Sequence, residues 1–112
     1  MKAYVLRKHG KPTVLQPTDI PIPALESEQV RVNIECIGLN YAEIMARKGF
    51  YGWAPQMPYT LGMEAYGKIE AIGDNVSARA VGDKVIIGTQ YGCYAEKFVG
   101  HWQATAPAIE QF

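Results

Sequence analysis

The sequence predicts a mainly β domain, a barrel or a sandwich, with one short helix. Short segments with alternating apolar and polar residues recur along the chain, and 11 glycines and seven prolines in 112 residues supply turns between them. Only Tyr41–Lys48 shows a helical period. Many short strands with frequent turns are typical of barrels and sandwiches. We expect a single domain over residues 1–112, because a chain of this length forms one compact unit.

The composition narrows the classes of function. The 11 lysines and arginines equal the 11 aspartates and glutamates in number, so the formal net charge is zero and a nucleic-acid partner is not expected. No apolar run approaches the roughly 20 residues that cross a bilayer, and the amino-terminal segment lacks the apolar stretch of a signal peptide. We therefore expect a cytoplasmic protein with no membrane span.

The first part of the chain predicts a hairpin followed by an irregular connection. Lys2–Arg7 alternates weakly and predicts a strand, and Gly10–Pro12 predicts a turn. Thr13–Gln16 is the expected hairpin partner. Three prolines between residues 17 and 23 remove backbone donors, so we expect that segment at a sheet edge or in a loop.

Val30–Leu39 is the clearest strand, because apolar residues occupy every second position. The predicted buried face consists of Val30, Val32, Ile34 and Cys36. Cys36 is expected to be a small core residue, and Cys93, beside a glycine, is expected to be the more exposed cysteine. Ile37 and Leu39 break the alternation, and we expect both faces of the strand to be covered there.

The helix Tyr41–Lys48 has recognisable start and stop residues. Asn40 is a favoured N-cap, Glu43 stands three residues later as in a capping box, and Gly49 is a good C-cap. The residues predicted to share one helical face are Tyr41, Ile44, Met45 and Lys48. Asn40 and Glu43 thus have a purely structural interpretation as helix-initiating residues.

The second half of the chain predicts one long loop and four strands. Phe50–Thr60 is rich in aromatic residues, glycine and proline, and loops of this length often cover a site. The strands expected after it are Tyr66–Ile72, Lys84–Ile87, Tyr94–Val99 and Gln103–Thr105. Gly67 lies inside the first of these strands and suggests a bulge or a close backbone approach.

No familiar catalytic motif is present in the sequence. His9 and His101 lie far apart and without neighbouring ligands, and neither C-x-x-C nor H-E-x-x-H occurs. Cys93 has no histidine close in sequence, and the glycine-rich phosphate loops are missing.

Four segments resemble the amino-terminal domain of the medium-chain dehydrogenase/reductase superfamily: GLNYAEIMARKGFY, PYTLGMEAYGKIEAIGDNV, VGDKVI and GCYAEKFV. They occur in the family's order and spacing and cover nearly the whole chain. The matching branch is the zinc-free quinone oxidoreductases, the zeta-crystallin and VAT-1-like group. The resemblance implies a GroES-like, partly open β-barrel with one short helix. It also implies no zinc, because Asn40 and Met63 stand where zinc-dependent members carry a cysteine and a histidine.

The resemblance implies hydride transfer from NADPH to a quinone or to an enone, that is, a carbon–carbon double bond conjugated to a carbonyl. It assigns Asn40 and Tyr41 to cofactor binding and Tyr51 and Asn40 to catalysis. It places Tyr51, Trp53 and Met45 in the substrate pocket. Each assignment has a structural alternative, and Glu43 and Glu64 are expected to be structural residues.

The same resemblance implies a partner domain. In relatives a Rossmann domain that binds NADPH follows the barrel, and its glycine-rich turn is absent from this sequence. We therefore expect the isolated chain to bind NADPH weakly or not at all and not to turn over. The alternative is a stand-alone GroES-like binding or assembly module without catalysis, and a homodimer remains open in either case.

Overall fold

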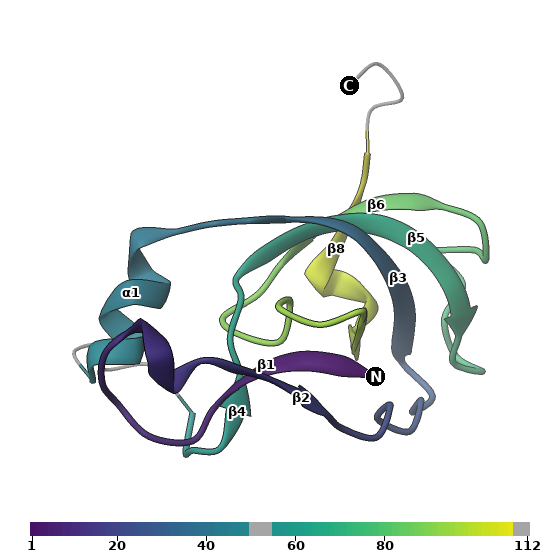
Figure 1. The fold of residues 1–112 in the computed structure, drawn as a ribbon. Helices are drawn as coiled ribbons and strands as arrows, with labels where there is room; N and C mark the ends of the chain where they lie inside the picture. The colour runs from purple at the N-terminus through teal and green to yellow at the C-terminus, as the bar shows by residue number, and fades with distance from the viewer. Residues whose placement is uncertain (50–54, 109–112) are drawn as a thin grey trace.

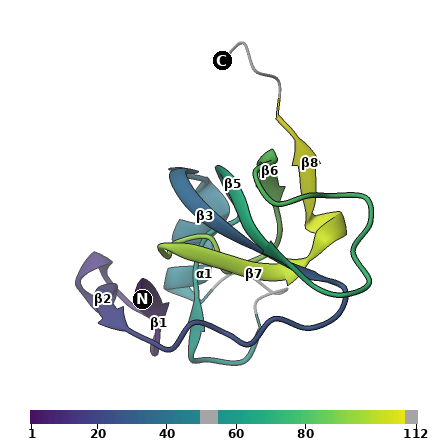
Figure 2. The same cartoon turned by 90° about the vertical axis from the view of Figure 1, so that its right-hand side faces the viewer.

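A computed structural model describes residues 1–49 and 55–108, which form two antiparallel sheets with one α-helix beside them (Figures 1 and 2). The strands are β1 (Lys2–Leu6), β2 (Gln16–Asp19), β3 (Gln29–Gly38), β4 (Tyr59–Thr60), β5 (Glu64–Ile72), β6 (Lys84–Gly88), β7 (Lys97–His101) and β8 (Thr105–Pro107). The helix is α1 (Tyr41–Lys48), and two 3-10 turns are η1 (Pro12–Val14) and η2 (Trp102–Ala104). The predicted mainly β, partly open barrel with one short helix is confirmed.

The smaller sheet has the strand order β2-β1-β4, and the larger has the order β7-β3-β5-β6-β8. They meet along β1, where Ala3 forms an isolated bridge with Ala95 and the Tyr4 backbone N–H donates to the Tyr94 carbonyl at 2.8 Å. The sheets therefore enclose a core without closing into a complete barrel.

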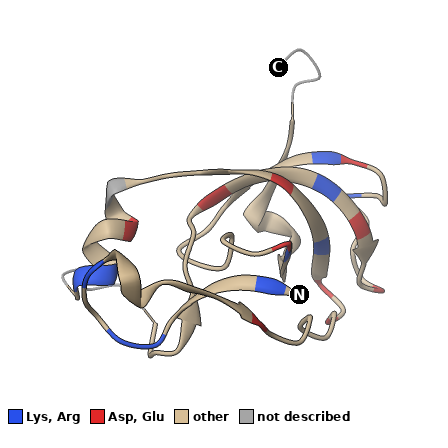
Figure 3. Cartoon of the chain, in the orientation of Figure 1, with Lys and Arg blue, Asp and Glu red and all other residues tan. Residues whose placement is uncertain are grey.

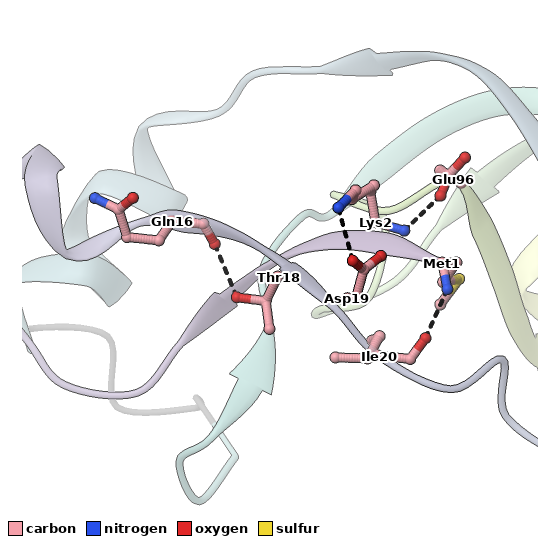
Figure 4. Close-up of polar contacts among 7 residues, drawn as sticks. All are labelled: Met1, Lys2, Gln16, Thr18, Asp19, Ile20 and Glu96. Carbon is pink, nitrogen blue, oxygen red and sulfur yellow. Dashed lines mark hydrogen bonds and ion pairs between the residues drawn. The ribbon is translucent and has the colours of Figure 1, made fainter.

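Polar contacts fix the amino terminus against both sheets (Figure 4). The Met1 ammonium donates to the Ile20 carbonyl at 2.7 Å, and Lys2 Nζ pairs with Asp19 at 2.7 Å. The Lys2 backbone N–H donates to the Glu96 carboxylate, which belongs to the segment before β7. The first strand is thus tied to β2 on one side and to the segment before β7 on the other.

Two groups of buried apolar residues form the interior. The first, which we call the sheet core, consists of Val30, Val32, Ala65, Ile69, Val76, Val85, Ile87, Cys93 and Phe98. The second, which we call the helix core, packs α1 against the smaller sheet and consists of Leu6, Ala46, Tyr59, Leu61 and Tyr94. Val30 and Val32 are completely buried, as the alternation in β3 predicts.

The carboxyl-terminal end of β3 differs from the prediction. Its pairing with β5 shifts register between Ile34 and Cys36, which redirects the following side chains. Cys36 is exposed and Cys93 is completely buried, so the predicted placement of the two cysteines is wrong. Leu39 is 80% exposed and Ile37 is 41% exposed, so the described residues do not cover both faces there.

Helix α1 has the predicted bounds, and Gly49 ends it in the left-handed conformation with φ of 86°. Its buried face is not the predicted one, because the helix buries Glu43, Ala46 and Arg47. Ile44 and Lys48 are exposed and Met45 is half-buried, whereas the Tyr41 side chain lies outside the described part. The buried face of α1 is therefore set by its contacts with the helix core and not by the spacing of apolar residues along the helix.

Two predicted strands near the chain ends are displaced. Pro12 begins a 3-10 turn where a strand over Thr13–Gln16 was expected, and β2 starts at Gln16. Most of the predicted strand Gln103–Thr105 is the 3-10 turn η2, because the Thr105 backbone N–H and hydroxyl both bond to the Trp102 carbonyl. Local turn hydrogen bonds override strand propensity at both places.

Charged side chains of both signs are interspersed over the described part of the molecule (Figure 3). On the larger sheet, Glu70 of β5 pairs with Arg31 of β3 and Lys97 of β7, both at 2.6 Å. No helix in the described residues is long and apolar enough to cross a membrane.

Candidate functional site

The candidate site lies where β3 ends, α1 begins and β5 starts. Asn40 occupies the junction between β3 and α1, and its side-chain amide donates to Glu64 Oε1 at 3.1 Å. Glu64 is the first residue of β5 and pairs in register with Gly38. A Cβ at Gly38 would lie 2.6 Å from Glu64 Cγ, so glycine is needed there for the carboxylate to lie across the strand.

Glu43 anchors this junction from the helix side. Glu43 is 6% exposed as a residue, and its carboxylate accepts from the backbone N–H groups of Asn40 and Met63, each at 2.9 Å. The Tyr94 hydroxyl also donates to it. The first bond is the expected capping contact, and the other two join α1 to the turn before β5 and to the segment before β7. The expectation that Glu43 and Glu64 are structural residues fits these contacts.

The buried neighbours of Glu43 are held in their neutral forms. Burial raises the pKa of the Cys93 thiol to about 12, with smaller contributions from the negative charges of Glu43 and Glu64. Burial, followed by the hydrogen bond to Glu43, raises the pKa of the Tyr94 hydroxyl far above its ordinary value. Neither group therefore supplies a thiolate or a phenolate at neutral pH.

The structure describes only part of the predicted site. Asn40 lies at the junction, and Met45 is half-buried on α1. Tyr51 and Trp53 lie outside the described residues, as does the side chain of Tyr41.

An apolar groove of about 600 Å³ adjoins the junction. It is lined by Cys36, Ile37, Gly38, Glu64, Ala65, Tyr66 and Ile86. None of these residues is among the predicted site residues. The break in alternation at Ile37 is the pattern in the sequence that marks this surface, but it predicts a covered strand end and not a groove.

The described residues provide no zinc site. No group of three or more histidine, cysteine, aspartate or glutamate residues within 1–49 and 55–108 has the arrangement of a metal centre. Asn40 offers an amide whose nitrogen donates to Glu64, and Met63 offers a thioether, whereas zinc prefers thiolate, imidazole and carboxylate. The donor set at this junction does not fit zinc.

Fold and site together define a domain of the alcohol dehydrogenase type. Residues 26–108 match the alcohol dehydrogenase GroES-like domain, and the chain belongs to this family. This confirms the predicted membership in the medium-chain dehydrogenase/reductase superfamily.

The relatives belong to the quinone oxidoreductase and VAT-1 groups. The chain is 38% identical to a rat (Rattus norvegicus) quinone oxidoreductase, over 98% of this chain and 34% of the rat protein. It is 47% identical to a zebrafish (Danio rerio) synaptic vesicle membrane protein VAT-1 homolog, over 69% of this chain and 16% of that protein. An Escherichia coli quinone oxidoreductase in complex with NADPH superimposes with a TM-score of 0.93 at 26% identity, over 100% of this chain and 34% of that one. The chain thus spans about a third or less of the length of these relatives.

Proposed function

We propose that residues 1–112 form the substrate-binding and catalytic half of a zinc-independent, NADPH-dependent oxidoreductase that reduces quinones or enones. The observation that carries the proposal is the Asn40–Glu64 junction beside an apolar groove, in a domain whose relatives include quinone oxidoreductases. The groove suits a flat, largely apolar acceptor, because most of its lining is aliphatic or aromatic.

Asn40 is suited to orient a carbonyl or carboxamide group. An amide nitrogen carries two hydrogens, and Glu64 accepts one of them at 3.1 Å. The second hydrogen remains for an oxygen of the substrate or of the nicotinamide. The bond to Glu64 fixes the orientation of the amide, and such pre-organisation strengthens a donor in an active site. In the proposal, Asn40 contacts a bound nicotinamide, and Tyr41 is the second contact.

A reduced nicotinamide, when bound, supplies the hydride. The residues of this chain bind the acceptor and stabilise its oxygen. In the proposal, the Tyr51 hydroxyl and the Asn40 amide each donate a hydrogen bond to the oxygen on which negative charge develops. Trp53 and Met45 shape the pocket around the ring or double bond.

The proposal places the pyrophosphate contacts of the cofactor outside this sequence. No G-x-G-x-x-G turn occurs within it, and relatives of the same fold are about three times as long. The expected result is therefore negligible NADPH-dependent reduction of benzoquinone by the 112-residue chain alone.

The direct test is a chimera in which this chain replaces the aligned 34% of rat quinone oxidoreductase. The proposal expects NADPH oxidation that depends on added quinone. Asn40→Ala and Tyr51→Phe should each lower kcat/KM by about tenfold to a hundredfold, as expected for the loss of one oriented donor. Tyr4→Phe, which removes an exposed hydroxyl on β1, is the matched control and should leave the rate unchanged.

An inactive chimera that binds NADPH and retains the native fold would contradict the catalytic role. It would favour the alternative of a stand-alone binding module without catalysis. Full activity in both site variants would contradict the assigned residues and leave the oxidoreductase assignment intact.

A further inference from the structure

The larger sheet carries two lysines directly opposite each other on its exposed face. Lys68 of β5 pairs in register with Lys84 of β6, and both residues are exposed. The Lys84 carbonyl accepts from the Ala108 N–H at 2.9 Å on the side of β8, so the two lysines form a non-hydrogen-bonded pair between β5 and β6. Side chains lie closest in such pairs, and two like charges placed there repel each other.

No carboxylate among the described residues neutralises this lysine pair. Neither lysine belongs to an ion pair within residues 1–49 and 55–108. The Glu70 carboxylate on the same sheet is already shared by Arg31 and Lys97, each at 2.6 Å. Asp83 accepts a backbone hydrogen bond, and the exposed Glu35 takes part in none of these ion pairs. The lysine pair is therefore a local positive charge that an external anion can neutralise.

An apolar row of side chains lies beside the lysine pair on the same face. Side chains two positions apart on a strand point to the same side, about 7 Å from each other, so Tyr66 and Ile86 follow Lys68 and Lys84. Tyr66 is in register with Ile86 on β6 and with Cys36 on β3. These three residues line the groove of about 600 Å³ beside Glu64. The lysine pair thus stands just beyond one end of that groove.

The opposite end of the groove is the junction of the candidate site. Glu64 lines the groove there and accepts from the Asn40 amide at 3.1 Å. Four residue steps along β5 separate Glu64 from Lys68, which corresponds to about 13 Å in an extended strand. The groove therefore has a carboxylate and an amide at one end, apolar side chains in the middle and two ammonium groups beyond the other end.

This order of groups selects a ligand class. A lysine ammonium on its flexible four-carbon stem binds anionic groups as a point charge. A ligand anion at the junction end would face the Glu64 carboxylate, so the lysine end is favoured. We propose that the quinone or enone of the proposed function carries a terminal anionic group that Lys68 and Lys84 bind, while its carbonyl lies toward Asn40. This inference rests on the proposed function and names the class of its substrate.

The binding test uses the 112-residue chain and two probes with one apolar body, phenylhexanoate and phenylhexanol. Neither probe is an electrophile, which matters because quinones react with exposed thiols such as that of Cys36. Each is titrated while the NMR signals of the Ile37 and Ile86 methyl groups are followed. We expect saturable shifts, with a dissociation constant about tenfold higher for the uncharged phenylhexanol. Salt at about 0.5 M should remove most of that difference.

Replacement of the lysines separates charge from packing. Lys68→Gln and Lys84→Gln should each raise the dissociation constant for phenylhexanoate about threefold, and the double variant about tenfold. Phenylhexanol binding should stay within about twofold of the native value in all three variants, because the apolar lining is unchanged. Lys8→Gln removes an exposed charge from the loop after β1 and is the matched control, with native affinity for both probes.

The proposal is overturned by equal binding of the two probes to the native chain, or by no saturable binding of either. Anion selectivity that persists in the double variant would overturn it as well. In the chimera with rat quinone oxidoreductase, a benzoquinone with a pentyl chain ending in a carboxylate should have a KM about tenfold below that of its methyl ester. An inactive chimera would contradict the proposed function, whereas the NMR titration decides anion binding without any cofactor, so the two failures are distinguishable.

Discussion

At the residue scale, Glu43 shows how a helix-initiating side chain becomes a centre of tertiary structure. The capping-box spacing explains its bond to the Asn40 backbone. Its contacts with Met63 and Tyr94 join segments 20 and 51 residues away in the sequence. Asn40 keeps its place at the candidate site through these contacts, and Glu43 is in this sense a positioning residue.

We predict that Glu43→Ala lowers the free energy of unfolding by about 3 kcal/mol, because one buried and two part-buried donors lose their acceptor. Glu43→Gln should cost less, since its amide oxygen still accepts. Urea denaturation followed by circular dichroism measures both values. Glu35→Ala, on an exposed glutamate of β3, is the control and should change stability by less than about 0.5 kcal/mol. A similar small effect for Glu43→Ala would contradict the anchoring role.

The two cysteines should differ in reactivity. The thiolate is the reactive form, and a raised pKa lowers its fraction at any given pH. Because burial raises the pKa of Cys93 to about 12, iodoacetamide at about pH 8 should alkylate the exposed Cys36 and spare Cys93. Peptide mass spectrometry of the folded chain and of the chain in urea measures this difference. Equal modification of both sites in the folded chain would show that Cys93 is accessible.

At the element scale, the pairing of β3 with β5 shapes the candidate site. The register shift after Ile34 turns Cys36 and Ile37 toward solvent beside the groove next to Glu64. Gly67 lies opposite Ile34 on β5, where the two backbones approach closely. The predicted role of this glycine is confirmed.

We predict that Gly67→Ala destabilises the domain by about 2–3 kcal/mol, because the new Cβ would lie 2.3 Å from the Asn33 carbonyl oxygen. Neither strand moves freely, since β3 is paired on both of its sides. Gly88→Ala, on β6, is the matched control because nothing lies within 4 Å of its added Cβ. Thermal unfolding of the two variants measures the difference, and equal melting temperatures would contradict the close approach.

At the scale of the whole molecule, β1 connects the two open sheets. The Ala3–Ala95 bridge and the bonds of Lys2 and Tyr4 to the segment before β7 provide that connection. The Tyr94 ring belongs to the helix core, and the neighbouring Cys93 belongs to the sheet core. The two cores therefore share a stretch of backbone.

We predict that the 112-residue chain unfolds in one cooperative transition. Leu61→Ala in the helix core and Ile69→Ala in the sheet core should each lower the free energy of unfolding by about 2–4 kcal/mol, as for other large-to-small core substitutions. In both variants, tryptophan fluorescence and far-ultraviolet circular dichroism should shift together, with an unchanged dependence on urea. Separate transitions for the two probes would show that the sheets unfold independently.

Much of the architecture followed from local patterns. Alternation predicted β3, and the capping residues predicted the bounds of α1, because both depend on contacts within a few residues. The four matching segments predicted the family. At η1 and η2 the sequence predicts strands, whereas the structure has 3-10 turns. Turn hydrogen bonds within a few residues outweigh the strand propensity at both places.

The sequence by itself thus determined the class of fold, the family and the position of Asn40 between a strand and a helix. Tertiary structure decided which side of α1 is buried and which cysteine is covered. The physical reason is that burial of a helix face and the register of a β pair depend on partners distant in the chain. The partners of Glu43 lie on two other segments, and no local pattern in the sequence encodes them.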